Sequence, residues 1–311
     1  MEALILFGSQ ISGGANKNSD KDILIISSLK KRKKYTKKYT SQGYSVSFYS
    51  KEQVLYMKKK GSLFLQHLKI ESKIIYDKDL IFSDFLKTCK LITPSAIEMN
   101  NCIESLKIAM LSPRNPLLHG WVADYIYVLS RDYFVKYFAT KGELFFNVNK
   151  LCKKIEYEFK LTPEDSRLLL ALREAKNIYR SRTVYLRMQW NIIERWVEIL
   201  TKILKINKKQ MLTPHTEISY LNLHFDYKFN SSYELLRYIE SLKILFPKVK
   251  CNHSDEMLIT KLIKNPNKYS STSKRNRLYL ETYLCEFKKK ANQNMHVDSK
   301  KLGRKSLAKL F

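Results

Sequence analysis

Four short apolar runs near the N-terminus have the length and composition of β-strands. They are residues 2–7, 20–26, 44–49 and 73–76. The segments between them place apolar residues at helical spacing. These predicted helices are 29–39, 51–60 and 62–70. Strands and helices in this mixed order predict a small sheet with helices packed on it.

The rest of the chain has the pattern of helices. The predicted helices are 95–110, 116–138, 162–204, 232–246, 255–264 and 274–290. The third of these has a clear start, because Thr162 is a good N-cap, Pro163 suits the first position, and Glu164 and Asp165 follow. Residues 206–230 are loop-like. The predicted fold class is therefore α+β, with a mixed sheet first and helices after it.

Changes in pattern along the chain predict four parts. They are a sheet domain over 1–92, a helical domain over 93–205, a further helical segment over 206–290 and a basic C-terminal tail over 291–311. The tail is polar and basic, and we expect it either to be disordered or to end in a short amphipathic turn around Leu307, Leu310 and Phe311.

Composition indicates a folded, strongly basic protein. The 311 residues are 44% hydrophobic and 12% aromatic, which are globular values. Lys and Arg number 57 against 29 acidic residues, so the formal net charge is +28. Such an excess favours polyanionic partners, with nucleic acid first and an anionic membrane second. The alternative is a compositional bias towards Lys, Ile, Asn and Tyr that carries no function.

Cysteine use and hydropathy indicate the compartment. The five cysteines are odd in number, widely spaced and never in a Cys-x-x-Cys pattern, which fits a reducing compartment without disulfides or a zinc site. We therefore expect them to be buried and inert. No apolar run approaches the ~20 residues of a membrane span, and the N-terminus does not have a signal-peptide pattern. The sequence predicts a cytoplasmic protein that does not enter membranes.

The candidate chemistry lies in the first two predicted strands. Gly8 and Ser9 follow the first strand, and the small glycine would let a phosphate approach the backbone. Asp20 and Asp22 open the second strand and point to the same face, because side chains alternate along a strand. Two adjacent carboxylates repel each other unless they share a cation, and hard oxygen ligands suit Mg²⁺. The alternative is an Asx-rich turn between two ordinary strands.

The N-terminal segment contains, in this order, an apolar residue, Gly8-Ser9, ten further residues, Asp20-x-Asp22 and an apolar strand. This order resembles the signature of the minimal nucleotidyltransferases of the DNA polymerase β superfamily. A looser resemblance over residues 60–77 extends the likeness to about the first 80 residues. The resemblance implies a nucleotidyltransferase fold, a nucleoside triphosphate such as ATP as substrate, phosphates at Gly8 and Ser9, and Mg²⁺ on Asp20 and Asp22.

The same resemblance implies a third carboxylate on the strand over 44–49, which would help to activate the attacking hydroxyl. The matching positions hold Ser45 and Ser47, and neither is acidic. Serine is a poor base at neutral pH. Glu52 and Glu71 are candidate substitutes, by proximity in the sequence alone.

Two basic clusters are candidate RNA contacts. Lys30, Lys31, Arg32, Lys33 and Lys34 lie between the second and third strands, where Tyr35 or Tyr39 could stack on a base. The alternative is a solvated helix face. A second cluster, Arg173, Lys176 and Arg180, shares one face of a predicted helix. Here the alternative is ion pairing with Glu164, Glu174 and Glu194.

One more pattern concerns RNA. Arg114-Asn115-x-x-x-His119 resembles the ribonuclease motif of HEPN domains, although Pro113 and Pro116 predict a loop or a helix start there. The alternative is an ordinary helix-start arginine with a packed histidine. The three tryptophans are expected to serve core packing.

Three functions follow from these patterns. The first is Mg²⁺-dependent transfer of a nucleotide from a triphosphate to RNA, for example to the 3′ end of tRNA. By analogy, such an enzyme fits a bacterial toxin of a toxin–antitoxin pair or an antiphage-defence effector, controlled by a regulatory protein partner. The second is an inactive nucleotidyltransferase fold that binds RNA or a partner protein. The third is a HEPN-type ribonuclease. Cationic aminoglycoside acceptors are disfavoured by the charge of +28.

Overall fold

The computed structural model describes residues 2–8, 10, 11, 13, 21–181, 190–206, 216–223, 229–264 and 274–307, the last range as backbone alone at residues 274–276 and from residue 295 onwards. By its internal contacts the chain divides into two compact units. One contains residues 1–102 and 130–171, and the other contains residues 103–129 and 172–311.

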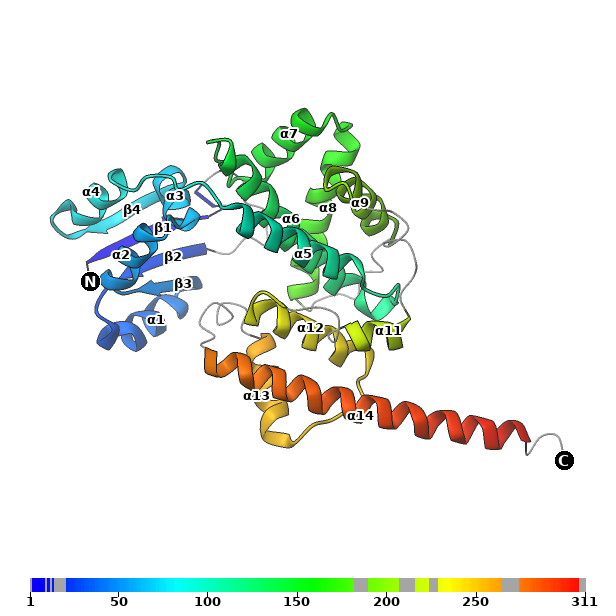
Figure 1. The fold of residues 1–311 in the computed structure, drawn as a ribbon. Coiled ribbons are helices and arrows are strands. Elements are labelled where there is room, and N and C mark those ends of the chain that lie inside the picture. The colour runs from blue at the N-terminus through cyan, green and yellow to red at the C-terminus, as the bar shows by residue number, and fades with distance from the viewer. Residues whose placement is uncertain are drawn as a thin grey trace. The chain divides into compact units, whose positions relative to one another are not determined.

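The first unit begins with a four-stranded mixed sheet (Figure 1). Its strands are β1 (Ala3–Phe7), β2 (Lys21–Ile26), β3 (Tyr44–Tyr49) and β4 (Ser72–Asp77). They lie in the order β3-β2-β1-β4, with β1 antiparallel to both its neighbours and β2 parallel to β3. The α+β class predicted from the pattern is confirmed.

Helices cover both faces of this sheet. They are η1 (Leu29–Lys31), α1 (Arg32–Thr40), α2 (Lys51–Lys59), α3 (Leu63–Ile70), η2 (Lys78–Leu80) and α4 (Ile81–Lys87). On one face, alternate residues of β1 and β2 pack against Val54 of α2, Leu65 of α3 and Phe82 of α4. On the other face, Ile23 and Ile25 pack near α1. The period of two along each strand therefore supplies two separate apolar layers.

Local signals explain where these helices start and stop. Ser50 caps α2, because its hydroxyl accepts from the Gln53 backbone N–H (3.3 Å) while the Gln53 side chain accepts from the Ser50 N–H (2.8 Å). This reciprocal pair is a capping box. After α2, Gly61 adopts φ +63°, a conformation that glycine tolerates best, and the chain turns into α3.

The remainder is helical, as predicted. Its helices are α5 (Ala96–Met110), η3 (Pro116–Leu118), α6 (His119–Thr140), α7 (Val148–Phe159), α8 (Pro163–Ser181), α9 (Trp190–Ile203), α11 (Glu217–Asn222), α12 (Ser232–Leu245), α13 (His253–Lys264) and α14 (Lys274–Leu307). Thr162 caps α8 as expected, since the Asp165 N–H donates to its hydroxyl.

Four details differ from the sequence prediction. Helix α7 was not predicted, although Asn147 caps it by accepting from the backbone N–H groups of Asn149 and Lys150. Helix α11 lies in the segment predicted as a loop. Helix α14 continues to Leu307, so most of the predicted tail is helical backbone. Finally, Cys285 is exposed, whereas the other four cysteines are buried as expected.

The helical core is aromatic. The largest fully buried side chains outside the sheet domain are Trp121, Trp196, Tyr220, Tyr238, Tyr283, Phe134, Phe138 and Phe287. Trp121 and Trp196 therefore serve packing, as the sequence predicted. Burial also raises the pKa of Cys102 and of Cys251 to about 11 each, so their thiolate fractions at neutral pH are small.

Candidate nucleotide-binding site

The end of β1 is shaped by Gly8. Its φ is +84°, in the left-handed region, and its carbonyl oxygen accepts from the Ile11 N–H at 3.1 Å. A Cβ built on Gly8 would lie 2.6 Å from Oδ2 of Asp22. Glycine is thus required twice at this position, by the backbone conformation and by the close approach of a carboxylate.

Asp22 stands on β2 directly opposite Phe7 of β1. It lies on the same face as Leu24 and Ile26, whose side chains pack in the layer under α2, α3 and α4. Asp22 is half-buried. Ser9 and Asp20, the other halves of the two predicted pairs, lie outside the described residues. The structure therefore places one carboxylate and the glycine of the predicted site side by side.

The neighbouring strand brings Ser45 to this carboxylate. In the parallel register of β2 and β3, Ser45 is the partner of Asp22, and Ser47 is the partner of Leu24. Both serines are half-buried. The nearest β3 side chain to Asp22 on this face is thus a hydroxyl. Among the residues that the structure describes, no group of three or more His, Cys, Asp or Glu could hold a metal ion.

A comparison with protein families identifies the domain in which these residues lie. Residues 1–80 match the family model described as polymerase beta, nucleotidyltransferase. The chain begins with a nucleotidyltransferase domain of the polymerase β family. No characterised protein and no solved structure gave a significant match to the chain.

Membership of this domain family supports three general properties. The nucleotidyltransferase domain supports nucleotidyl transfer, its substrate is a nucleoside triphosphate, and the family generally uses a divalent metal. The match covers the sheet, α1 to α3 and η2, and it ends just before α4. No helix within the described ranges is long and apolar enough to cross a membrane.

Neither predicted substitute for the third acid is well placed in the nucleotidyltransferase domain. Glu52 lies in the first turn of α2, beyond the end of β3, whereas Ser45 is near the start of that strand. Five residues of strand separate the two ends by roughly 17 Å. Glu52 is therefore at the far end of the sheet from Asp22.

Glu71 is at the right end of the sheet but has other partners. It precedes Ser72, which pairs with Phe7. Its carboxylate lies 3.4 Å from Nε2 of His67 and accepts from the Asn147 N–H at 3.1 Å. Burial raises the pKa of Glu71, but the hydrogen bonds and charge of His67 and the Asn147 N–H outweigh burial and hold it below its usual value. This carboxylate anchors α3 to the start of α7.

His67 is a neighbour of the site that the sequence prediction missed. Its ring meets the Phe7 ring edge-on with centroids 6.1 Å apart, and it stacks on Phe146 at 4.8 Å. Phe7 is in turn the cross-strand partner of Asp22. The spacing of His67 and Glu71, four apart on one helix, was the available signal. This signal was weak, because the sequence spacing alone does not show that His67 contacts Phe7, the cross-strand partner of Asp22.

The basic residues before and along α1 are exposed. Lys30 and Lys31 lie in η1, and Arg32, Lys33 and Lys34 open α1. Because β2 and β3 are parallel, α1 runs back along the sheet, so these five cations lie towards the end remote from Asp22. Tyr35 and Tyr39, predicted to stack on a base, instead pack on the sheet face formed by Ile23, Ile25 and Phe48.

The second basic cluster is engaged within the fold. Arg180 contacts the fully buried Asp124 through Nη2 (2.9 Å) and Nε (3.1 Å), and Lys176 lies over the Tyr127 ring at 5.2 Å. Arg173 also makes an interaction within the fold. The ion pairing considered as the alternative is present for Arg180, but with Asp124 instead of the predicted glutamates.

The residues of the HEPN-like pattern have structural roles of their own. Arg114 lies in the loop before η3 and pairs with Glu194 at 3.3 Å. Asn115 caps η3 by accepting from the Leu117 N–H, and its amide donates to Glu217. His119 begins α6 and packs against Trp190 with ring centroids 4.8 Å apart.

Proposed function

We propose that this chain transfers a nucleotide from a nucleoside triphosphate to a hydroxyl group of RNA. Asp20 and Asp22 would hold Mg²⁺, and the backbone at Gly8 and Ser9 would receive the phosphates. The observation that carries the proposal is the contact of Asp22 with Gly8, where an added Cβ would meet Oδ2 at 2.6 Å. A metal ligand and a phosphate-binding turn need this closeness, because the ion must touch both the carboxylate and the phosphate.

The donor chemistry available at the site fits a hard divalent cation. Asp22 offers carboxylate oxygens beside an open backbone turn, and Ser45 offers a hydroxyl from the adjacent strand. When bound, the metal would neutralise charge on the triphosphate. The chain's own part is to orient the triphosphate at Gly8 and to hold the Asp22 carboxylate beside it. The acceptor oxygen would then bond to the α-phosphorus as its proton passes to water, and the bond to the α,β-bridging oxygen would break to release pyrophosphate.

RNA is favoured as the acceptor by charge. The net charge is +28, and five consecutive cations from Lys30 to Lys34 are exposed on the nucleotidyltransferase domain. Such a row binds a phosphate backbone without reading its sequence. If the acceptor is the 3′ end of tRNA, the added nucleotide would block aminoacylation. That is the activity expected of a toxin or an antiphage effector.

The test is a labelling assay with each radiolabelled nucleoside triphosphate, Mg²⁺ and total RNA. Asp22→Asn should lower transfer by at least about 100-fold, because it removes a charged group from the reacting phosphates. Asp84→Asn is the matched control, since Asp84 is an exposed aspartate of α4 that pairs only with Lys87 among its described contacts. Transfer that survives Asp22→Asn would contradict the proposal.

Gly8→Ala gives an independent test of the contact with Asp22. The new methyl group would displace the carboxylate and occupy a left-handed backbone position, so stability should fall by about 1–2 kcal/mol. Transfer should fall more than this loss explains, since the folded fraction stays high. A Gly43→Ala variant is the control, because Gly43 also has positive φ (+82°) but an added Cβ there meets nothing within 4 Å.

A second function is favoured by one specific observation, the serine beside Asp22. A nucleotidyltransferase fold without its third acid could bind RNA or a partner protein without catalysis. Ser45→Asp separates the two. If the missing carboxylate limits transfer, this variant should raise it by about 100-fold, the lower end of the range for general-base catalysis. Ser47→Asp should do less, because Ser47 pairs with Leu24 and lies two residues, about 6.6 Å, further along β3.

The assays distinguish the transferase from a binding module and from a ribonuclease. RNA binding without labelling in the native chain, in Asp22→Asn and in Ser45→Asp would support the binding module. The contacts of Arg114 and His119 do not favour a ribonuclease, because Arg114 is held by Glu194 and His119 packs on Trp190. If the native chain cleaves RNA and His119→Ala does not, that result would support the ribonuclease hypothesis.

A further inference from the structure

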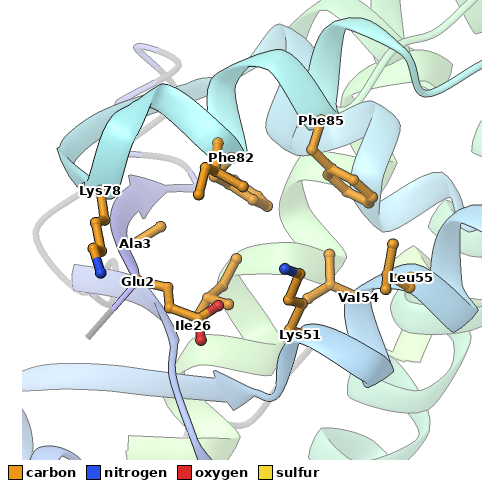
Figure 2. A pocket seen from close by; sticks show the side chains of 10 residues that line it. Glu2, Ala3, Ile26, Lys51, Val54, Leu55, Lys78, Phe82 and Phe85 are labelled. Atoms are coloured by element: carbon orange, nitrogen blue, oxygen red, sulfur yellow. The ribbon is translucent and has the colours of Figure 1, made fainter.

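A pocket lies at the end of the sheet opposite to Asp22. Its floor is Ala3 and Ile26, which are cross-strand partners at the remote ends of β1 and β2. Its walls are Val54 and Leu55 of α2, and Ile81, Phe82 and Phe85 of α4. Figure 2 shows Phe82 and Phe85 above the space, and Val54 below it. The pocket is therefore a gap between two helices that cover one face of the sheet.

The depth of the pocket is apolar and its mouth is charged. Ala3, Ile26, Val54 and Phe82 are at most 6% exposed, so the floor is dry core surface. Lys51, Lys78 and Glu2 surround the opening, and Figure 2 shows the Lys51 ammonium directed towards the space between the helices.

The two lysines give the mouth a net positive charge. Neither Lys51 nor Lys78 forms an ion pair within 4.0 Å with any residue of the described ranges. Lys87 of the wall helix α4, in contrast, pairs with Asp84 at 2.8 Å. Glu2 contributes the one negative charge, and its backbone carbonyl already accepts from the Lys78 N–H. An anionic group at the mouth would meet two cations and one carboxylate.

The volume of the cavity limits the size of the ligand that it can hold. The cavity has a volume of about 250 Å³. This exceeds the ~150 Å³ apolar cavity that takes benzene and falls below the roughly 300–1,000 Å³ of sites for drug-sized ligands, so about eight to twelve non-hydrogen atoms fit. A nucleotide is too large and too polar for it.

We propose that this pocket binds a small amphipathic carboxylate, with an apolar body of about eight carbons among Ile26, Val54 and Phe82 and its carboxylate between Lys51 and Lys78. The body is an aliphatic chain or a single ring, because the floor offers no polar side chain. The ligand packs on the strands whose other ends carry Gly8 and Asp22. The binding is separate from nucleotidyl transfer, so its test does not depend on catalysis.

The experiment is a titration of the full chain, carrying ¹³C-labelled Ile, Leu and Val methyl groups, with octanoate below its micellar range. The methyl resonances of Ile26, Val54, Leu55 and Ile81 should shift together, because all four line the pocket. Those of Ile23 and Ile25 should not, because these side chains pack on the opposite face of the sheet. Octanol and octylamine, with the same chain length, report what the carboxylate adds.

We expect octanoate to bind more tightly than octanol, and octanol more tightly than octylamine. Each of Lys51→Glu and Lys78→Glu should weaken octanoate by about two- to fivefold, the range for exposed ion pairs. Lys59→Glu is the matched control, since it makes the same charge change on α2 at an exposed residue outside the pocket. Leu55→Trp should abolish binding by filling the mouth, and Leu55 is 48% exposed, so the variant should fold.

Three results would overturn the proposal. The first is no methyl shift at Ile26 and Val54 with octanoate. The second is equal binding of octanoate and octylamine, which would show an apolar cavity without preference for an anion. The third is octanoate binding unchanged in Leu55→Trp, provided the circular dichroism spectrum and melting temperature of that variant match those of the native chain.

Discussion

The basic residues around α1 and those of α8 look alike in the sequence, yet their surroundings differ. Lys30 to Lys34 are exposed on the surface of the nucleotidyltransferase domain. Arg180 instead reaches the fully buried Asp124, which also binds Arg237 at 2.9 Å. A basic run is therefore a candidate nucleic-acid site only where the fold leaves its charges exposed to solvent.

Asp124 is part of a network of buried charged residues in the second unit. Arg237 is 3% exposed, and it contacts Asp124 and Glu240, the latter at 2.7 Å. The Tyr179 hydroxyl donates to Glu240 at 2.8 Å. The Arg237 guanidinium also lies over the Trp121 ring, 5.3 Å from its centroid. Charges taken out of water in this way depend on each other, because each would be costly to bury alone.

The largest effect is expected at the centre of this network. Asp124→Ala removes the buried carboxylate that Arg180 and Arg237 share and leaves Arg237 paired with Glu240. The free energy of unfolding should fall by about 3 kcal/mol, the lower end of the range for a broken buried pair. Urea denaturation followed by circular dichroism measures the loss. Asp84→Ala is the control, because Asp84 forms an exposed pair with Lys87 and should change stability by at most about 0.5 kcal/mol. Equal losses would contradict the assigned importance of burial.

A smaller effect is expected at Arg180. Its side chain is 33% exposed, and Asp124 keeps Arg237 when Arg180 is removed. Arg180→Ala should therefore cost about 1 kcal/mol in unfolding free energy, as for a hydrogen bond to a charged group that is partly screened by water. Filter binding should show little change in RNA affinity. A large loss of RNA affinity with unchanged stability would instead indicate that α8 contacts nucleic acid.

The smallest effect on stability is expected at the exposed basic residues of η1 and α1, together with the largest effect on RNA binding. The triple variant of Lys31, Lys33 and Lys34 to Ala should leave the unfolding free energy within about 0.5 kcal/mol, because these side chains are exposed. RNA affinity should fall, and the slope of log K against log salt should flatten by about 2, since each phosphate contact adds about 0.7 for a single strand. An unchanged slope would exclude this surface as the RNA site.

A fourth prediction concerns the pH dependence of the pair beside the candidate site. The pKa of Glu71 is lower in the folded chain than its usual 4.5, so the ionised form stabilises the fold above that pH, and the stabilisation is lost as the pH falls through the folded value. Glu71→Gln should cost about 1 kcal/mol at pH 7, the net value of a hydrogen bond. The difference from the native chain should shrink below pH 4.5 in denaturation series. A constant difference would contradict the role of the charge.

Much of the sheet domain was predictable because its signals are local. Alternating and continuous apolar runs predicted β1 to β4 almost to the residue, and Thr162 marked the start of α8 by side-chain capping. Gly8 and Asp22 could be named from a short motif. Helix α7 was not predicted, and the Asn147 side chain that caps it was the local signal available in the sequence.

Short-range patterns and residue types were sufficient to predict the class of fold, the family of the first domain and the candidate residues Gly8, Asp22 and Ser45. Which charges are paired within the fold depends instead on tertiary packing, because Asp124 meets Arg180 and Arg237 from 56 and 113 residues away. Tertiary packing also places Ser45 beside Asp22, pairs Glu71 with His67, and brings Lys51 and Lys78 to one pocket. Register and packing create these neighbours across long stretches of chain, and no local pattern of residues encodes them.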